Sequence, residues 1–137
     1  MSLPSIGYNV AGKVAFITGA NRGIGKALVD GFFRHGATKV YAAVRSLESA
    51  DPLVEKYGPE KVTPIHIDLQ NVSSIREAAK TATDVQVVVN NAGVLDMTDI
   101  LSQEDAMPAL EKSMEVNVYS LVHMAQNFAP VLETNGG

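Results

Sequence analysis

The sequence has no cysteine among its 137 residues, which excludes disulfide bonds and metal sites with thiolate ligands. A chain without thiols fits the reducing cytoplasm, where we expect the protein to lie. No apolar run approaches the length of a membrane-spanning helix, and residues 1–6 lack the basic start of a signal peptide. The net charge is −4, without a block of like charges, which argues against nucleic acid and membrane surfaces as partners.

What the sequence does contain is a regular alternation of apolar runs and helical patterns. The predicted strands are 13–18, 39–44, 62–67 and 86–89, the predicted helices are 23–34, 53–57, 72–82 and a long one from 104–108 to 132, and 94–103 is a predicted loop. This alternation indicates a parallel sheet with helices on both faces. Right-handed crossovers and a reversal at the first strand give the strand order 3-2-1-4, a Rossmann-type, doubly wound α/β fold.

The segment Thr18-Gly19-Ala20-Asn21-Arg22-Gly23-Ile24-Gly25 joins the first strand to the first helix. Gly19 lets the chain leave the strand with unusual backbone angles, Gly23 leaves room for a phosphate, and Gly25 lets the helix pack close to the strand. The free N–H groups of the helix N-terminus attract an anion. We therefore predict a pyrophosphate-binding turn, with contacts from Gly19, Asn21, Arg22, Gly23, Ile24 and Gly25.

Three further features accompany this turn. Asp68-Leu69 closes the third strand, Asn90-Asn91-Ala92-Gly93 follows the fourth, and Asn117 lies inside the long helix. Together the set resembles the classical short-chain dehydrogenase/reductase family. The family's TGxxxGxG motif is matched at every fixed position from Thr18, and its NNAG motif is matched in full. The resemblance extends from about residue 12 to residue 137.

The resemblance implies an oxidoreductase that transfers a hydride between a nicotinamide cofactor and a small-molecule carbonyl or alcohol substrate. It implies that Asn90 ties neighbouring strands, and that the segment 91–93 (Asn91, Ala92 and Gly93) lets the backbone approach the cofactor. Asn117 matches the family's catalytic asparagine, which bends its helix and whose main chain holds a proton-relaying water. An ordinary exposed helical asparagine is the alternative. Asp68 is expected to accept from the adenine amino group, with Leu69 or Ile67 against the ring, although Asp68 could instead cap a helix or stabilise its loop.

The end of the second predicted strand distinguishes between the two nicotinamide cofactors. An NAD-binding site usually places a carboxylate there, for the ribose 2′-hydroxyl. Here the strand is followed by Arg45 and Ser46, with no acid before Glu48. The guanidinium of Arg45 suits a phosphate, and Arg22 can approach from the glycine turn. We therefore predict NADP(H) rather than NAD(H); the alternative is that both arginines are simply solvated.

The family's serine and Tyr-x-x-x-Lys pair, expected after the fifth strand, has no counterpart in residues 1–137. Tyr57 and Lys61 have the right spacing, but Gly58 and Pro59 between them would break the helix that must carry both side chains. They also precede the NNAG segment. Residues 1–137 are therefore predicted to form an NAD(P)-binding domain, truncated before the catalytic serine and Tyr-x-x-x-Lys. The alternative function is a cofactor-binding module or fragment without activity of its own.

The remaining expectations concern metals and assembly. The three histidines, His35, His66 and His123, lie apart from other ligand-type residues, so no metal site is predicted. An epimerase or dehydratase relative would share the glycine turn, but the NNAG segment followed by Asn117 argues against it. In the family the long helix often forms a four-helix interface, which implies a homo-oligomer formed through the last predicted helix.

Overall fold

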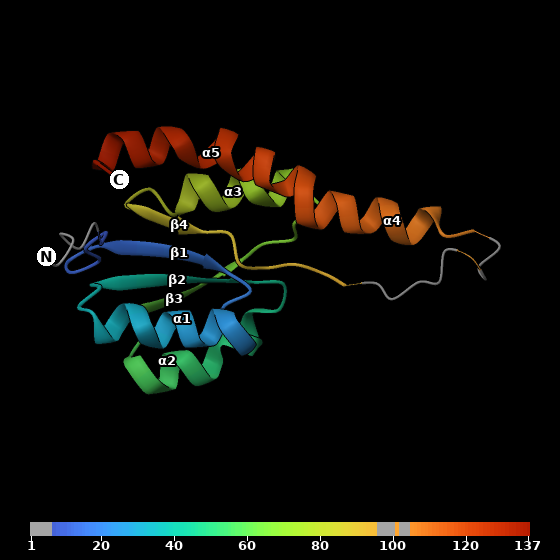
Figure 1. Ribbon diagram of the computed structural model, residues 1–137. Coiled ribbons are helices and arrows are strands. Elements are labelled where there is room, and N and C mark those ends of the chain that lie inside the picture. Colours follow the sequence, from blue (N-terminus) through green and yellow to red (C-terminus); the bar gives the residue numbers. More distant parts are fainter. Residues whose placement is uncertain (1–6, 96–100, 102–104) are drawn as a thin grey trace, which may run out of the picture.

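The computed structural model describes residues 7–95, 101 and 105–137. A single parallel sheet has the strand order β3-β2-β1-β4, as predicted. Helices α1 and α2 cover one face of the sheet, and α3 and α5 cover the other (Figure 1). The elements are β1 (Val14–Thr18), α1 (Gly23–Arg34), β2 (Lys39–Val44), the 3₁₀ helix η1 (Leu47–Ala50), α2 (Asp51–Tyr57), β3 (Val62–His66), α3 (Val72–Thr81), β4 (Val87–Val89), α4 (Met107–Met114), the π-helical turn η2 (Glu115–Tyr119) and α5 (Ser120–Asn135).

The strands are apolar on both sides because helices cover both faces of the sheet. In the central strand β1, Phe16 points to one face, whereas Ala15 and Ile17 point to the other. The cluster under α3 and α5 includes Phe16, Ile75 and Phe128. The cluster under α1 and α2 includes Ile17, Val29 and Leu53. The expected three-layer core is therefore present.

The two edges of the sheet differ. On one side β3 carries Pro64 opposite Ala42 of β2, and proline is tolerated there because an edge strand leaves one side of its backbone unpaired. On the other side β4 is a strand of three residues paired only with β1 among the described strands. Its residues Val87–Val89 are half-buried.

Local signals explain most of the helix ends. Gly36 follows α1 with φ +87°, and its N–H donates to Phe33 O, as a glycine after a helix does. Asn71 caps α3 by accepting from Ser73 N at 3.0 Å. The 3₁₀ helix η1 was not predicted, because four residues are too few to show a helical period.

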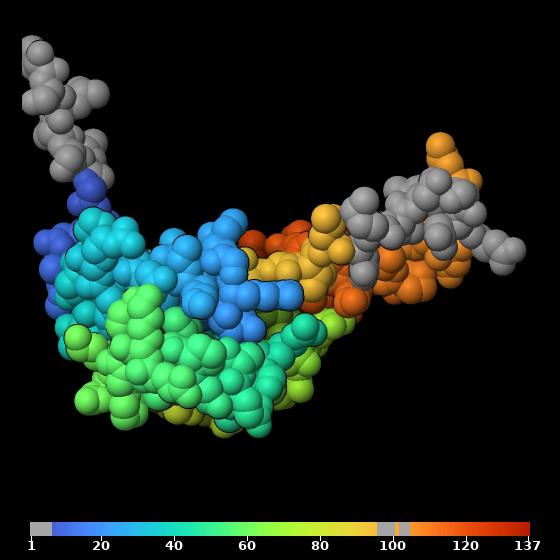
Figure 2. All heavy atoms as spheres, turned by 90° about the horizontal axis from the view of Figure 1, so that it is seen from below, coloured from blue at the N-terminus to red at the C-terminus, as the bar shows by residue number. Residues whose placement is uncertain are grey.

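The last predicted helix forms, with two differences. It reaches Asn135, beyond the expected end at residue 132, and Gly136 with φ +67° ends it. The π-helical turn η2 interrupts it between α4 and α5, where periodicity alone predicts a continuous α-helix. Its expected start at residue 104 and much of the loop expected at 94–103 lie outside the described residues. Helix α4 projects beyond the sheet and beyond the layer of α1 and α2 (Figure 2).

The contact between Phe128 and Phe16 is expected to hold α5 on the sheet. Phe128 is 1% exposed, and the two ring centroids are 4.5 Å apart. Phe128→Ala should lower the free energy of unfolding by about 3–5 kcal/mol, because it leaves a cavity in the core. Urea denaturation measures this loss. Gln126→Ala, at an exposed position of the same helix, should change stability by less than about 0.5 kcal/mol; equal losses in both variants would contradict the packing.

Candidate cofactor-binding site

A cavity of about 540 Å³ lies at the carboxyl ends of the strands. Every residue predicted to bind the cofactor lines it, except Gly25. The full lining is Gly19, Asn21, Arg22, Gly23, Ile24, Ala43, Val44, Arg45, Ser46, Ile67, Asp68, Leu69, Gln70, Asn91, Ala92, Gly93, Val94 and Val116. Segments far apart in the sequence converge here because parallel strands end at the same edge of a sheet.

The glycine turn places the start of α1 directly at the end of β1. A Cβ on Gly25 would lie 2.0 Å from Gly19 O, so only glycine allows this approach. Gly25 therefore acts by packing, behind the cavity wall. At Gly23, by contrast, a Cβ would meet nothing within 4 Å, and the space beside the helix start is open.

The N-terminus of α1 is chemically suited to an anion. Arg22 occupies the capping position but its side chain makes no capping hydrogen bond, and the first turn contains no acidic residue. The unpaired N–H groups and the positive end of the helix dipole therefore face the cavity. Ile24 is 74% exposed at this point, so the helix start is accessible from solvent.

Hydrogen bonds tie the glycine turn to the NNAG segment. Thr18 Oγ1 accepts from Asn91 N and Ala92 N, each at 3.0 Å, and it donates to Val89 O at 3.4 Å. In return, Asn91 Nδ2 donates to Thr18 O at 3.0 Å and Gly19 O at 3.4 Å. Two walls of the cavity are therefore held as one unit.

This network corrects one expectation and adds one residue. The tie expected of Asn90 is made by Asn91, whereas Asn90 is exposed, because successive residues of an extended chain point to opposite sides. Thr18 was not among the predicted site residues, although its side chain is 1% exposed and makes three of these bonds. Its fixed place in the glycine motif was the signal that could have identified it.

Arg22 and Arg45 reach the same cavity from two different loops. Between β2 and α2, Ser46 Oγ donates to Glu48 Oε2 at 2.6 Å, and this hydrogen bond holds the pKa of the Glu48 carboxyl below its usual value. The short helix η1 turns Glu48 back toward Ser46. The sequence alone did not predict that this acid lies so close to the end of β2. The end of β2 therefore carries one negative charge as well as the guanidinium of Arg45.

The Asp68 carboxylate partly stabilises its own loop. Its Oδ1 accepts from Gln70 N at 3.0 Å, and its backbone N–H donates to Ser74 Oγ at 2.8 Å. Among the described residues, no hydrogen bond is made to Oδ2. Oδ1 of Asp68 therefore stabilises the loop, as the alternative expected. Oδ2 remains available to a ligand in the cavity, which Asp68 lines.

Asn117 clamps the chain that follows the NNAG segment. Its Oδ1 accepts from Val94 N at 2.8 Å, and its Nδ2 donates to Val94 O at 2.7 Å. A Cβ on Gly93 would lie 3.1 Å from Asn117 Oδ1, so a larger residue would press on the clamp. Asn117 lies in the π-helical turn η2, and such turns are frequent at functional sites.

Tyr57 does not line this cavity, and its contacts join two helices. Its hydroxyl donates to Asp30 Oδ1, and its ring centroid is 4.4 Å from that of Phe33, so it joins α2 to α1. Burial and the hydrogen bond to Asp30 raise the pKa of the Tyr57 phenol, the opposite of what a proton-transferring tyrosine needs. Lys61 lies in the turn before β3, which agrees with rejecting Tyr57 and Lys61 as a catalytic pair.

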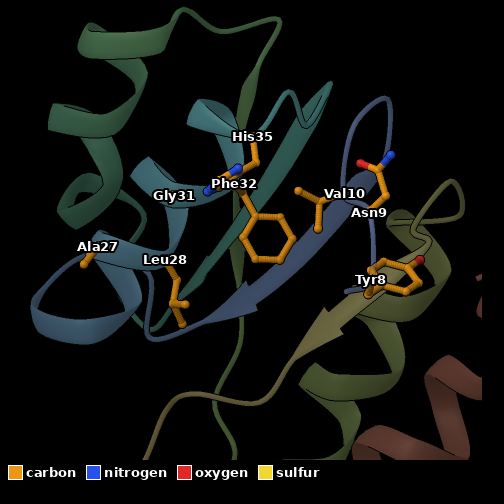
Figure 3. A pocket seen from close by; sticks show the side chains of 8 residues that line it. All are labelled: Tyr8, Asn9, Val10, Ala27, Leu28, Gly31, Phe32 and His35. Atoms are coloured by element: carbon orange, nitrogen blue, oxygen red, sulfur yellow. The ribbon is translucent and has the colours of Figure 1, made fainter. Parts of the chain in front are cut away.

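A second cavity, of about 410 Å³, lies between the segment before β1 and the later turns of α1. Figure 3 shows Leu28 and Phe32 of α1 lying opposite Val10 and Tyr8. None of the motif residues lines it. Of the two cavities, only the larger therefore combines a helix N-terminus, cations and open glycine backbone.

The part of the chain that the structure describes contains neither a metal-binding cluster nor a membrane-spanning helix. Over the described residues, no group of three or more histidine, cysteine, aspartate or glutamate side chains is placed to hold a metal ion. None of the helices that the structure describes combines the length and apolar character needed to cross a membrane.

Known proteins are similar to this chain in sequence and in fold. The chain is 35% identical to the short-chain dehydrogenase/reductase phmF of Phaeosphaeria nodorum, over 92% of this chain and 39% of that protein. A short chain dehydrogenase from Burkholderia cenocepacia, solved in complex with NADP, superposes with a TM-score of 0.81 at 37% identity, covering 95% of this chain and 52% of that one. A blue fluorescent protein from a metagenomic library, solved with NADPH, gives a TM-score of 0.74 at 30% identity, covering 88% and 51%.

The match also defines how much of the family fold is represented. The chain spans about half the length of the relatives it matches, or less, so the four-stranded sheet corresponds to one part of a larger fold. The family description "short chain dehydrogenase" matches residues 13–137, nearly the whole sequence. The chain therefore belongs to the short chain dehydrogenase family.

Proposed function

We propose that this chain is the NADP(H)-binding part of an oxidoreductase that transfers a hydride between the nicotinamide and a carbonyl or alcohol substrate. The observation that carries the proposal is the convergence of an uncapped α1 N-terminus, the open backbone at Gly23 and two arginines on one cavity. A dinucleotide with an additional phosphate matches this combination, because each of its anionic groups meets N–H donors or a guanidinium.

Different residues of the cavity would bind different parts of the cofactor. The pyrophosphate would lie at the glycine turn, and the 2′-phosphate between Arg22 and Arg45, with Ser46 beside it. The adenine ring would lie at Leu69, with Asp68 Oδ2 accepting from its amino group. The bound structures of the Burkholderia cenocepacia and metagenomic proteins, at 37% and 30% identity, support NADP(H) as the cofactor.

When bound, the nicotinamide supplies or accepts the hydride. The segment 91–93 holds the inner wall of the cavity in place through Thr18. We assign Asn117 a catalytic role, in which its side chain fixes Val94 and its main chain would hold the proton-relaying water that the family resemblance implies. The proton donor itself is expected to be the family's tyrosine, outside these 137 residues. A binding module without chemistry of its own is the second candidate, favoured by a described cavity whose side chains suit binding rather than proton transfer.

We also propose that the apolar side of the long helix binds a second copy of the chain. Its exposed apolar side chains recur three or four residues apart in each half of the helix, and they are Met107, Leu110, Val118, Leu121 and Val122. Helix α4 buries no residue of its own, and a helix of eight residues is not stable without tertiary contacts. If two such helices paired, each would cover the exposed apolar side chains of the other and give α4 the contacts that it lacks.

Binding of NADP⁺ to the 137-residue chain, measured by calorimetry, tests the proposed function. Gly23→Val should abolish binding, because its side chain would fill the open space beside the helix start. Gly31→Ala is the matched control: it also lies on α1 with nothing within 4 Å of its Cβ, but outside this cavity. It should leave affinity unchanged. Micromolar binding by a natively folded Gly23→Val variant would contradict the assignment of the glycine turn to the pyrophosphate.

Arg45→Asp should reverse the cofactor preference. The wild-type chain should bind NADP⁺ more tightly than NAD⁺, and the variant should favour NAD⁺, because a carboxylate repels the 2′-phosphate and accepts from a 2′-hydroxyl. Charge-assisted hydrogen bonds contribute about 1.5–3 kcal/mol each, so the affinity ratio should shift at least about tenfold. Arg76→Asp, on α3 outside the cavity, should not change the ratio. Equal affinities of the wild type for both cofactors would contradict the assignment.

Sedimentation velocity tests the pairing through the long helix. The chain should sediment as a dimer or larger species, and Leu121→Glu should shift it toward the monomer, because a carboxylate in an apolar interface is costly to desolvate. Gln126→Glu, an exposed polar position of the same helix, adds the same charge and should leave the assembly intact. A wild type that is monomeric at all concentrations tested would refute the pairing.

A further inference from the structure

Gln70 connects two walls of the cofactor cavity. Its backbone N–H donates to Asp68 Oδ1 at 3.0 Å, and its side-chain Nε2 donates to Glu115 Oε2 at 3.1 Å. Gln70 itself lines the cavity. One residue therefore holds the Asp68 carboxylate with its main chain and a residue 45 positions away with its side chain.

Glu115 is the first residue of the π-helical turn η2. The next residue, Val116, is 7% exposed and lines the same cavity. Asn117 follows and clamps Val94. The bond from Gln70 thus reaches the turn that contributes Val116 to the lining and carries the asparagine assigned to catalysis.

This contact lies on the outer side of the loop after β3. Its inner side is fixed, since Leu69 packs against the core under α3 and α5 and Ser74 Oγ donates to Asp68 O at 2.8 Å. Gln70 is exposed, and Glu115 is the partner of its side chain. Without that bond, the Asp68 carboxylate would sample more positions before a ligand arrives, and ordering it would cost affinity.

We infer that Gln70 and Glu115 form a positioning pair that holds the adenine end of the cavity against the turn carrying Asn117. This inference rests on the proposed function, because it assumes that NADP(H) occupies the cavity. The pair does not touch the reacting atoms; it acts through Asp68 and Val116. The bond is charge-assisted, with a neutral amide donor and a carboxylate acceptor, so exchanging the two residues restores it in the opposite direction.

The test is an exchange experiment on the 137-residue chain. Dissociation constants are measured by calorimetry with NADP⁺ and with adenosine 2′,5′-bisphosphate, which represents the adenine half alone. Gln70→Ala and Glu115→Ala should each weaken both ligands about three- to tenfold, as expected for one lost hydrogen bond. Gln70→Glu alone should weaken them further, because it places two carboxylates together. The double variant Gln70→Glu/Glu115→Gln should recover affinity to within about twofold of the wild type.

Controls separate positioning from folding. Glu111→Ala removes a carboxylate from an exposed position of α4 one turn earlier and should leave both affinities unchanged. Thermal melts without ligand measure the stability of each variant. If the bond were purely structural, its loss would lower the melting temperature and leave the affinity for both ligands unchanged. Two outcomes would overturn this inference alone, provided that the wild type binds both ligands. One is that the alanine variants bind with the same affinity as the wild type, and the other is that the exchanged double variant does not recover affinity. Failure of the wild type to bind either ligand would overturn the proposed function together with it.

Discussion

The approach of Gly25 to the carbonyl oxygen of Gly19 sets the geometry on which the rest of the site depends. No side chain can stand at position 25, since a Cβ would lie 2.0 Å from that oxygen. The helix start is thereby brought against the end of the central strand, with its unpaired N–H groups facing the cavity. The same carbonyl accepts from Asn91 Nδ2, so the contact also determines where the NNAG segment lies.

The sheet topology converts this local contact into a binding site. The chain passes from β1 to β2 and β3 on one side, and then returns to β4 on the other side of β1. The loops that follow β1 and β4 therefore diverge at the carboxyl end of β1. Arg45 arrives from one side, and the segment 91–93 from the other. The long helix then closes the cavity with Val116, held to the sheet through Phe128.

The chemistry of the described site is that of binding and positioning. The polar side chains that line the cavity are those of Asn21, Arg22, Arg45, Ser46, Asp68, Gln70 and Asn91. The amide of Asn117 lies next to them and holds Val94. The tyrosine at the family's spacing, Tyr57, is used to join α1 and α2, and its raised pKa makes it a poor proton donor or acceptor at neutral pH. The spacing Tyr-x-x-x-Lys therefore does not by itself mark a catalytic pair.

The sequence by itself determined the strand order, the two-sided core and most of the cavity lining, whereas Gln70, Val94 and Val116 entered it unpredicted. These follow from local signals: apolar runs, glycines at turns and the motifs at strand ends. Only the tertiary structure decided that Asn91 rather than Asn90 makes the tie, that Glu48 folds back to Ser46, that the long helix contains a π-helical turn at Asn117, and that Gln70 meets Glu115. Each of these depends on side-chain direction or on partners far apart in the chain, and neither spacing nor periodicity carries that information.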